Sequence, residues 1–210
     1  LKYINFDKAI DLLEKMIRTI EKLQKWNGHL YNWYNTKTLE PLIPRYISTV
    51  DSGNYVGYLY TVKQFLIQKI ESRKIKEDEI NNEPITQKLE ALIKILDNQI
   101  NATDFSYLYN EKNRLFSIGF NIEDNKLTDS YYDLLASEAR QTSFIAIAKK
   151  DIPSKHWQNL SRTLTSLNKY KGLISWSGTS FEYLMPNINM RKYEGSLLDE
   201  SCKFMVMSQK

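Results

Sequence analysis

Residues 6–25, which read FDKAIDLLEKMIRTIEKLQK, predict an amphipathic helix near the start of the chain. Their apolar members recur at steps of three and four residues, the spacing that places side chains on one face of a helix. These members are Phe6, Ile10, Leu13, Ile17, Ile20 and Leu23. We therefore expect a helix that buries one side against other helices.

Two further helices are expected to follow the same pattern. Asp51 and Ser52 can cap a helix from about Asn54 to Ser72, and Pro84 suits the first turn of another. The apolar stripe of the first contains Val56, Leu59, Val62, Phe65, Leu66 and Ile70, and that of the second contains Ile85, Leu89, Leu92, Ile93, Leu96 and Ile100.

The second half of the chain predicts one hairpin and several more helices. Alternating apolar residues flank the polar turn Asn110–Asn113, which is typical of a short β-hairpin. Ser130 and Asp133 resemble a capping box that opens a helix at residues 130–148. Shorter helices are expected near His156, after Thr179 and after Ser196. Because no βαβ rhythm is present, we expect an all-α fold of helical hairpins with a small β-hairpin insertion.

Composition excludes several classes of protein. The 210 residues are 42% apolar, enough for a sizeable core, and the mixed charges, +4 in sum, form no stripe for nucleic acid. Cys202, the single cysteine, and two histidines predict no disulfide and no metal site. Phosphate-binding glycine loops are missing, so no cofactor is expected. Since no apolar run approaches about 20 residues, we expect no direct membrane contact and a cytoplasmic location.

Carboxylates beside aromatic residues are the remaining candidates for chemistry. In the predicted helix, Glu138 aligns with apolar residues, and a carboxylate on an inward face loses hydration, which raises its pKa as a general acid requires. The alternative is a half-exposed glutamate neutralised by Arg140 or by a neighbouring helix. Glu182 fits a capping box with Thr179, which alone would explain it, although Trp176 leaves a sugar-facing role open.

An aromatic loop is expected at residues 26–50, which is longer than ordinary connections. Trp33 and Tyr34 in this loop could stack on sugar rings or could simply be buried. Asp51 follows the loop and is either a cap or, if the loop lines a cleft, a carboxylate that binds hydroxyl groups. Fourteen tyrosines suit a ligand that is both carbon-rich and hydroxylated.

Four longer stretches resemble one known family. They are His29–Leu39 (HLYNWYNTKTL), Ser48–Asn54 (STVDSGN), Ser130–Arg140 (SYYDLLASEAR) and Leu173–Pro186 (LISWSGTSFEYLMP). In this order they resemble the glucoamylase-like central region of cyclic β-1,2-glucan synthases. Asn35 and Ser180 depart from the residues that are frequent there, aspartate and methionine, without removing a proposed catalytic group.

The resemblance implies that residues 1–210 are a single fragment, the first half of a domain with an incomplete (α/α) toroid. It implies an enzyme that transglycosylates and cyclises linear β-1,2-glucan, attached to the inner membrane through other parts of the protein. Its partners would be β-1,2-glucan chains, a membrane glycosyltransferase region upstream and a phosphorylase-like region downstream. A second essential glutamate is expected beyond Lys210, so this fragment alone is expected to be inactive.

The resemblance also implies a set of site residues. Glu138 and Glu182 would be catalytic, and Trp33, Tyr34, Asp51, Ser52, Asn54, Tyr132, Arg140, Trp176 and Ser177 would bind substrate. Two rival functions remain open: a glycoside hydrolase of the endo-β-1,2-glucanase type, and a non-catalytic helical module that binds glucan or another protein. Related domains of this fold hydrolyse β-1,2-glucans, so the fold does not decide the reaction.

Overall fold

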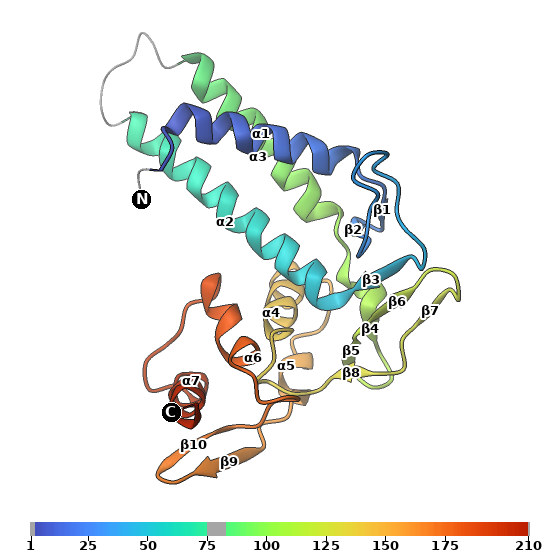
Figure 1. Cartoon of the computed structure of the whole chain (residues 1–210), viewed down its shortest axis with the longest axis vertical. Coiled ribbons are helices and arrows are strands. Elements are labelled where there is room, and N and C mark those ends of the chain that lie inside the picture. Colours follow the sequence, from blue (N-terminus) through green and yellow to red (C-terminus); the bar gives the residue numbers. More distant parts are fainter. Residues whose placement is uncertain (1–2, 75–82, 210) are drawn as a thin grey trace. The chain divides into compact units, whose positions relative to one another are not determined.

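The computed structural model describes residues 3–74 and 83–209, and the chain divides into two compact units (Figure 1). Unit 1 contains Leu1–Leu42 and Tyr58–Asp104, and unit 2 contains Ile43–Gly57 and Phe105–Lys210. Helix α2 (Thr49–Lys74) begins in unit 2 and continues into unit 1.

Unit 1 is built on α1 (Phe6–Lys22), α3 (Glu83–Ala102) and the part of α2 after Gly57. The Asn5 side chain caps α1 by accepting the Lys8 N–H at 2.9 Å. The core of unit 1 comes from the three predicted stripes, which confirms their helical period. The buried members are Ile10, Ile17, Leu59, Leu66, Ile70, Leu89, Leu92, Leu96 and Ile100. Phe65 is the exception, because it is exposed and lies under the Lys69 ammonium.

A tight hairpin follows α1, where the sequence had predicted an irregular loop. Strands β1 (Lys25–Trp26) and β2 (His29–Leu30) are joined by Asn27-Gly28, both with positive φ, as the favoured two-residue hairpin turn requires. A Cβ on Gly28 would lie 2.1 Å from the Ala102 carbonyl oxygen, so glycine permits the close approach to the end of α3.

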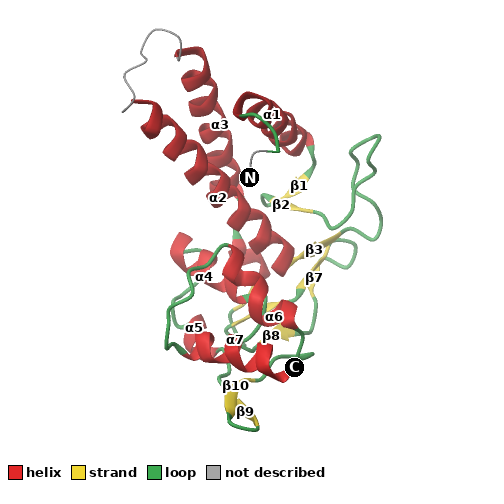
Figure 2. Cartoon of the chain, turned by 60° about the vertical axis from the view of Figure 1, so that its left-hand side comes forward, coloured by secondary structure: helices red, strands yellow, loops and turns green. Residues whose placement is uncertain are grey.

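Unit 2 contains two antiparallel sheets of three strands each and one hairpin (Figure 2). The first sheet has the order β3 (Tyr46–Ser48), β6 (Gly119–Asn121), β7 (Lys126–Leu127). The second has the order β4 (Tyr109–Asn110), β5 (Leu115–Ser117), β8 (Tyr131–Tyr132), and the hairpin joins β9 (Leu164–Leu167) to β10 (Tyr170–Leu173). Strands β4 and β5 confirm the hairpin predicted around residues 110–113.

The prediction of an all-α fold is therefore wrong. The described residues form four small antiparallel sheets besides the helices. The strands are only two to four residues long, too short to show a clear alternation of apolar and polar residues. Several also pair with distant segments, as Ile47 does with Phe120. The fold combines helices with small sheets.

Helix α4 (Arg140–Lys149) is much shorter than the helix predicted at residues 130–148. Residues 131–132 form β8 and pair with β5, and residues 133–139 contain a bridge, a bend and a turn. Pairing with a distant strand outweighs the local helical pattern here. Glu138 consequently lies in a turn and not on a helix face.

Short helices complete unit 2. They are η1 (Phe105–Leu108), α5 (His156–Asn159), α6 (Ser180–Leu184), η2 (Met185–Ile188) and α7 (Leu197–Ser208). Helix α7 packs on β10, and its predicted start is confirmed because Ser196 Oγ accepts the Asp199 N–H at 3.2 Å. One buried cluster in this region contains Leu135, Ala136, Leu160, Leu173, Tyr183 and Met205.

The first turns of α2 lie directly against α4. Thr142 Oγ1 donates to the Thr49 carbonyl at 3.2 Å, and Gln141 Nε2 donates to the Gly53 carbonyl at 3.3 Å. A Cβ on Gly53 would lie 1.9 Å from Thr142 Oγ1 and 2.8 Å from its Cα, so α4 can approach only because residue 53 is glycine.

We predict that Gly53→Ala destabilises the protein by about 1–3 kcal/mol, because overpacking outweighs the gain of about 1 kcal/mol that alanine brings to a helix interior. Urea unfolding measures the difference. Gly57→Ala is the matched control: its Cβ meets the flexible end of Gln141 at 2.3 Å, so a smaller loss is expected. A Gly53→Ala protein as stable as the original would contradict the packing argument.

Candidate functional site

Three carboxyl groups from distant segments gather in unit 2. Glu138 lies in the turn before α4, Asp51 lies in the first turn of α2, and Glu182 lies in α6. The negative charges of Asp51 and Glu182 both act on the Glu138 carboxyl. The fold therefore brings together three of the acids that the sequence singled out.

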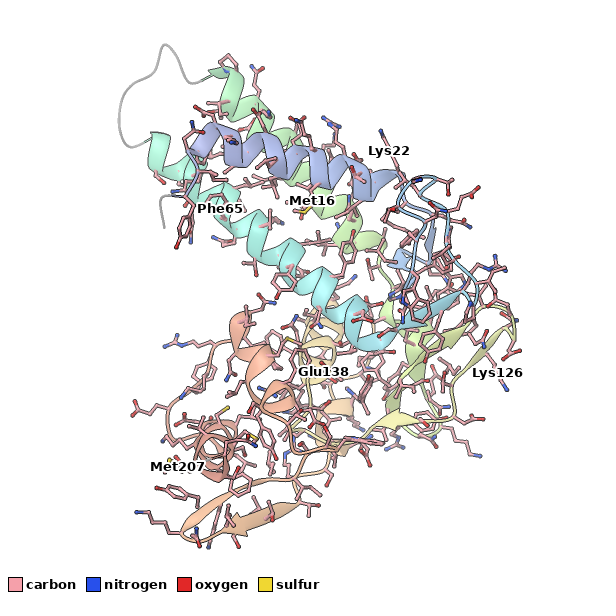
Figure 3. The ribbon with its side chains drawn as sticks, viewed as in Figure 1. Met16, Lys22, Phe65, Lys126, Glu138 and Met207 are labelled. Carbon is pink, nitrogen blue, oxygen red and sulfur yellow. The ribbon has the colours of Figure 1, made fainter. Side chains whose placement is uncertain are left out.

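Glu138 is half-buried between the buried residues Ser137 and Ala139 (Figure 3 labels it). Among the described residues, none donates a hydrogen bond to its carboxyl or forms an ion pair with it. Burial raises the pKa of Glu138, and the charges of Asp51 and Glu182 raise it further. The raised pKa agrees with the expectation from the sequence, although a turn and not a helix face produces it.

Asp51 is not the cap of α2. The helix begins at Thr49, earlier than predicted, and Ser48 Oγ accepts the Asp51 N–H at 3.2 Å. Ser48 thus takes the capping role, and the Asp51 side chain is exposed. An acidic residue in the first turn interacts favourably with the helix dipole. Asp51 is left as an exposed carboxylate near Glu138.

Tyr132 places a phenol group beside these acids. Burial raises its pKa well above the ordinary range, and the charges of Glu138 and Asp51 add to this shift. The phenol therefore stays neutral and can both donate and accept a hydrogen bond. Tyr46 acts on the same phenol, and its own hydroxyl lies 3.0 Å from Thr128 Oγ1. Tyr46 is a neighbour that the sequence analysis did not assign to the site.

The Glu182 carboxylate is occupied as a helix cap, which confirms the capping box. Ser177 Oγ donates to Oε2 at 2.8 Å, Ser175 Oγ at 3.0 Å and the Thr179 N–H at 3.0 Å. The Ser177 N–H and the Thr179 hydroxyl also donate to this carboxylate. Burial alone would raise the pKa of Glu182, but these hydrogen bonds outweigh it and lower the pKa. Glu182 is a poor proton donor.

Arg140 is buried, with 2% of its surface exposed, and does not open to a ligand. Its guanidinium donates to the carbonyl oxygens of Ser137, Glu182 and Tyr183 at 3.1, 3.0 and 2.7 Å. Burial lowers the pKa of Arg140 to about 10. The sequence expectation that Arg140 neutralises Glu138 or binds substrate does not agree with these contacts.

Some of the other predicted substrate-binding side chains are exposed, whereas others form hydrogen bonds within the protein. Ser52 is buried and donates to the Ser48 carbonyl at 2.8 Å, and Ser177 is bound to Glu182. Asn54 is half-buried, and its Oδ1 accepts from Gln141 Nε2 at 3.4 Å. Trp176 is 58% exposed and follows Ser175.

Trp33 and Tyr34 belong to unit 1. Trp33 is 52% exposed within that unit. The Tyr34 hydroxyl donates to the Gln24 carbonyl at 2.7 Å and accepts the Tyr31 N–H at 2.9 Å, so it holds the loop together. Trp33 is therefore the one of this pair with a free surface.

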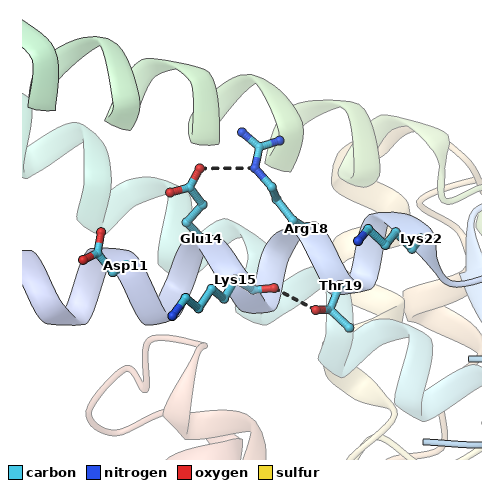
Figure 4. A pocket seen from close by; sticks show the side chains of 6 residues that line it. All are labelled: Asp11, Glu14, Lys15, Arg18, Thr19 and Lys22. Atoms are coloured by element: carbon cyan, nitrogen blue, oxygen red, sulfur yellow. Dashed lines mark hydrogen bonds and ion pairs between the residues drawn. The ribbon is translucent and has the colours of Figure 1, made fainter. Parts of the chain in front are cut away.

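Two surface hollows of the described residues do not include these acids. One of about 380 Å³ follows the outer side of α1 in unit 1 (Figure 4), where Glu14 is paired with Arg18 at 3.2 Å. It is lined by Asp11, Glu14, Lys15, Arg18, Thr19 and Lys22. Another of about 450 Å³ in unit 2 lies between α7, Leu184 and Tyr170. Neither contains Glu138, Asp51 or Glu182.

At residues 3–74 and 83–209, no three His, Cys, Asp or Glu side chains are arranged so that they could hold a metal ion together. No helix within the same ranges combines the length and the apolar character needed to cross a membrane.

The fold is glucoamylase-like. The chain superposes with a TM-score of 0.71 on the crystal structure of a "putative glucoamylase" from Bacteroides caccae ATCC 43185. The match covers 98% of this chain and 51% of that protein, with 12% sequence identity. This similarity establishes the fold, not the reaction.

The sequence itself is similar to a particular enzyme. Over 99% of its length the chain is 28% identical to the cyclic β-(1,2)-glucan synthase NdvB of Rhizobium meliloti (strain 1021), of which it spans 11%. The resemblance to cyclic β-1,2-glucan synthases is therefore confirmed. No protein-family profile matches the chain.

We predict that Asp51→Asn lowers the pKa of Glu138, because it removes one of the two negative charges that raise it. The pKa stays above the ordinary value, since burial, the largest cause, remains. Titration of the Glu138 carboxyl carbon by NMR measures the shift. Asp133→Asn is the control, because Asp133 is exposed in the same segment and does not act on Glu138. Equal titration curves for Asp51→Asn and the unchanged protein would show that the two groups do not interact.

Proposed function

We propose that this chain contributes the acid side of a glucan-processing active site, with Glu138 as the general acid. The observation that carries the proposal is the state of this carboxyl: half-buried, raised in pKa and next to two other acids. The similarity to a cyclic glucan synthase over 99% of the chain supports a glucan as the substrate.

The chemistry of such a site requires a proton at neutral pH. A carboxylic acid with a raised pKa protonates the glycosidic oxygen as the bond breaks, and its carboxylate then accepts a proton from the incoming hydroxyl group. Glu138 fits this role because no described side chain competes for its oxygens. Glu182 fits it poorly because five donors hold it ionised.

The neighbouring groups suit a hydroxylated ligand. We assign the exposed Asp51 carboxylate and the neutral Tyr132 phenol to binding sugar hydroxyls, and the exposed Trp176 ring to stacking on a sugar face. Glu182 then orders the loop at residues 175–179 beside this ligand. Its catalytic role, and the role of Trp33, stay predictions from the sequence.

The specific reaction that we propose is transglycosylation of linear β-1,2-glucan. A hydroxyl group of the same glucan molecule replaces water as the acceptor and closes a ring. The similarity to the R. meliloti cyclic β-(1,2)-glucan synthase supports this choice over hydrolysis. The proposed partners are β-1,2-glucan chains and the glycosyltransferase and phosphorylase-like regions that the family resemblance implies.

We predict that Glu138→Gln lowers kcat by about 10²–10⁴-fold, the usual contribution of a general acid. Linear β-1,2-glucan conversion is measured with the natural protein that carries this sequence. Asp133→Asn makes the same charge change in the same segment and should leave turnover unchanged. Near-normal turnover of Glu138→Gln would remove Glu138 from the mechanism and leave the non-catalytic binding module as the better explanation.

The products separate transfer from hydrolysis. We expect cyclic glucan to form without an increase in reducing ends, because the acceptor is a hydroxyl of the same chain. The glycosidic bond that breaks releases the reducing-end part of the glucan as a shorter linear chain, so the number of reducing ends is unchanged. Mass spectrometry identifies the ring because it is one water lighter than a linear glucan of the same length, and a reducing-end assay follows the alternative. Reducing ends that accumulate with each cleavage would identify an endo-β-1,2-glucanase.

A further inference from the structure

The Arg140 guanidinium links the segment of Glu138 to the segment of Glu182. Nη1 donates both to the Ser137 carbonyl, adjacent to Glu138, and to the Glu182 carbonyl. Nη2 donates to the Tyr183 carbonyl and to Asn187 Oδ1 at 3.4 Å. One side chain therefore joins the acid turn to α6 and η2.

Arginine suits this position for a geometric reason. Its planar group directs several N–H donors from fixed positions, whereas lysine offers donors from a single nitrogen. Three of the four acceptors are backbone carbonyls, so the link sets where the main chain of the two segments lies. Among the described residues, no carboxylate pairs with Arg140, so charge neutralisation does not explain the residue.

The two linked segments are themselves held in place. The Tyr183 hydroxyl donates to the Leu173 carbonyl at 2.6 Å, which ties α6 to β10. On the other side, the Gln141 N–H donates to the Glu138 carbonyl at 3.3 Å, which joins the acid turn to α4. Arg140 is thus the described side chain that connects the turn with α6 by hydrogen bonds to both.

We propose that Arg140 is a positioning residue that holds the turn of Glu138 at a fixed separation from α6. The inference rests on the proposed function of Glu138. Arg140 contacts no substrate in this view and acts only through the placement of the acid.

Arg140→Lys tests the proposal by kinetics in the natural protein. We expect kcat to fall about 10–100-fold, because displacement of a catalytic group by about 1 Å is enough for such a loss, while KM stays nearly constant. Arg162→Lys is the matched control: Arg162 also donates to three backbone carbonyls of unit 2, but these belong to Trp157, Gln158 and Leu160. It should leave kcat unchanged. A rise in KM at constant kcat, or no change in either, overturns the proposal.

Amide hydrogen exchange provides a readout that does not depend on activity. In Arg140→Lys, exchange should become faster at residues 138–141 and 182–187, while α1 in unit 1 stays unchanged. Unchanged exchange at these residues overturns the positioning role even if activity falls. If Arg140→Lys does not fold, Asn187→Ala is the second test, because it removes one of the four contacts of Arg140. A loss of kcat smaller than about 10–100-fold, together with faster exchange, supports the link. Unaltered kcat and exchange overturn it.

The outcomes also separate this inference from the proposed function. An active Glu138→Gln variant contradicts the function, whatever Arg140 does. An inactive Glu138→Gln variant supports the function. If kcat is then unchanged in Arg140→Lys although exchange around Glu138 is faster, the function is retained and the positioning role is rejected.

Discussion

The close approach of α4 to the first turns of α2 is the constraint on which unit 2 depends. Gly53 presents no side chain to Thr142, and the Thr142 hydroxyl and Gln141 amide donate to carbonyls of α2. Because Asp51 precedes Gly53 by two residues and Glu138 precedes α4 by two, the contact also brings these acids together. This close packing therefore places the charge of Asp51 where it adds to the effect of burial on the pKa of Glu138.

The sequence predicted the parts of the fold that local periodicity encodes. The stripes of α1, α2 and α3 supply most of the buried core of unit 1, because the three-to-four spacing suffices to define a buried helix face. Strands β3 and β8 escaped prediction because their partners, β6 and β5, are far away in the chain. Local signals do predict hairpins: the polar turn at residues 110–113 predicted β4 and β5, and Asn27-Gly28 is an equally strong signal for β1 and β2.

The candidate site was predictable in its residues and less so in its geometry. Glu138 was selected from a helical pattern that the structure does not contain, yet its environment raises its pKa as expected. The pairing of β8 with β5 changed the local structure without removing the burial. Arg140 could not be assigned from sequence, because its acceptors are mainly carbonyl groups, which no residue type reveals.

The capped state of Glu182 affects how this protein should be compared with its relatives. Five donors between Ser175 and Thr179 give evolution a folding reason to keep a glutamate at this position, whether or not the protein retains activity. Invariance of Glu182 among relatives would therefore carry no information about chemistry. Glu138 has no such structural partner in the described part of the chain, so selection that preserves it would have to act on what the carboxyl does.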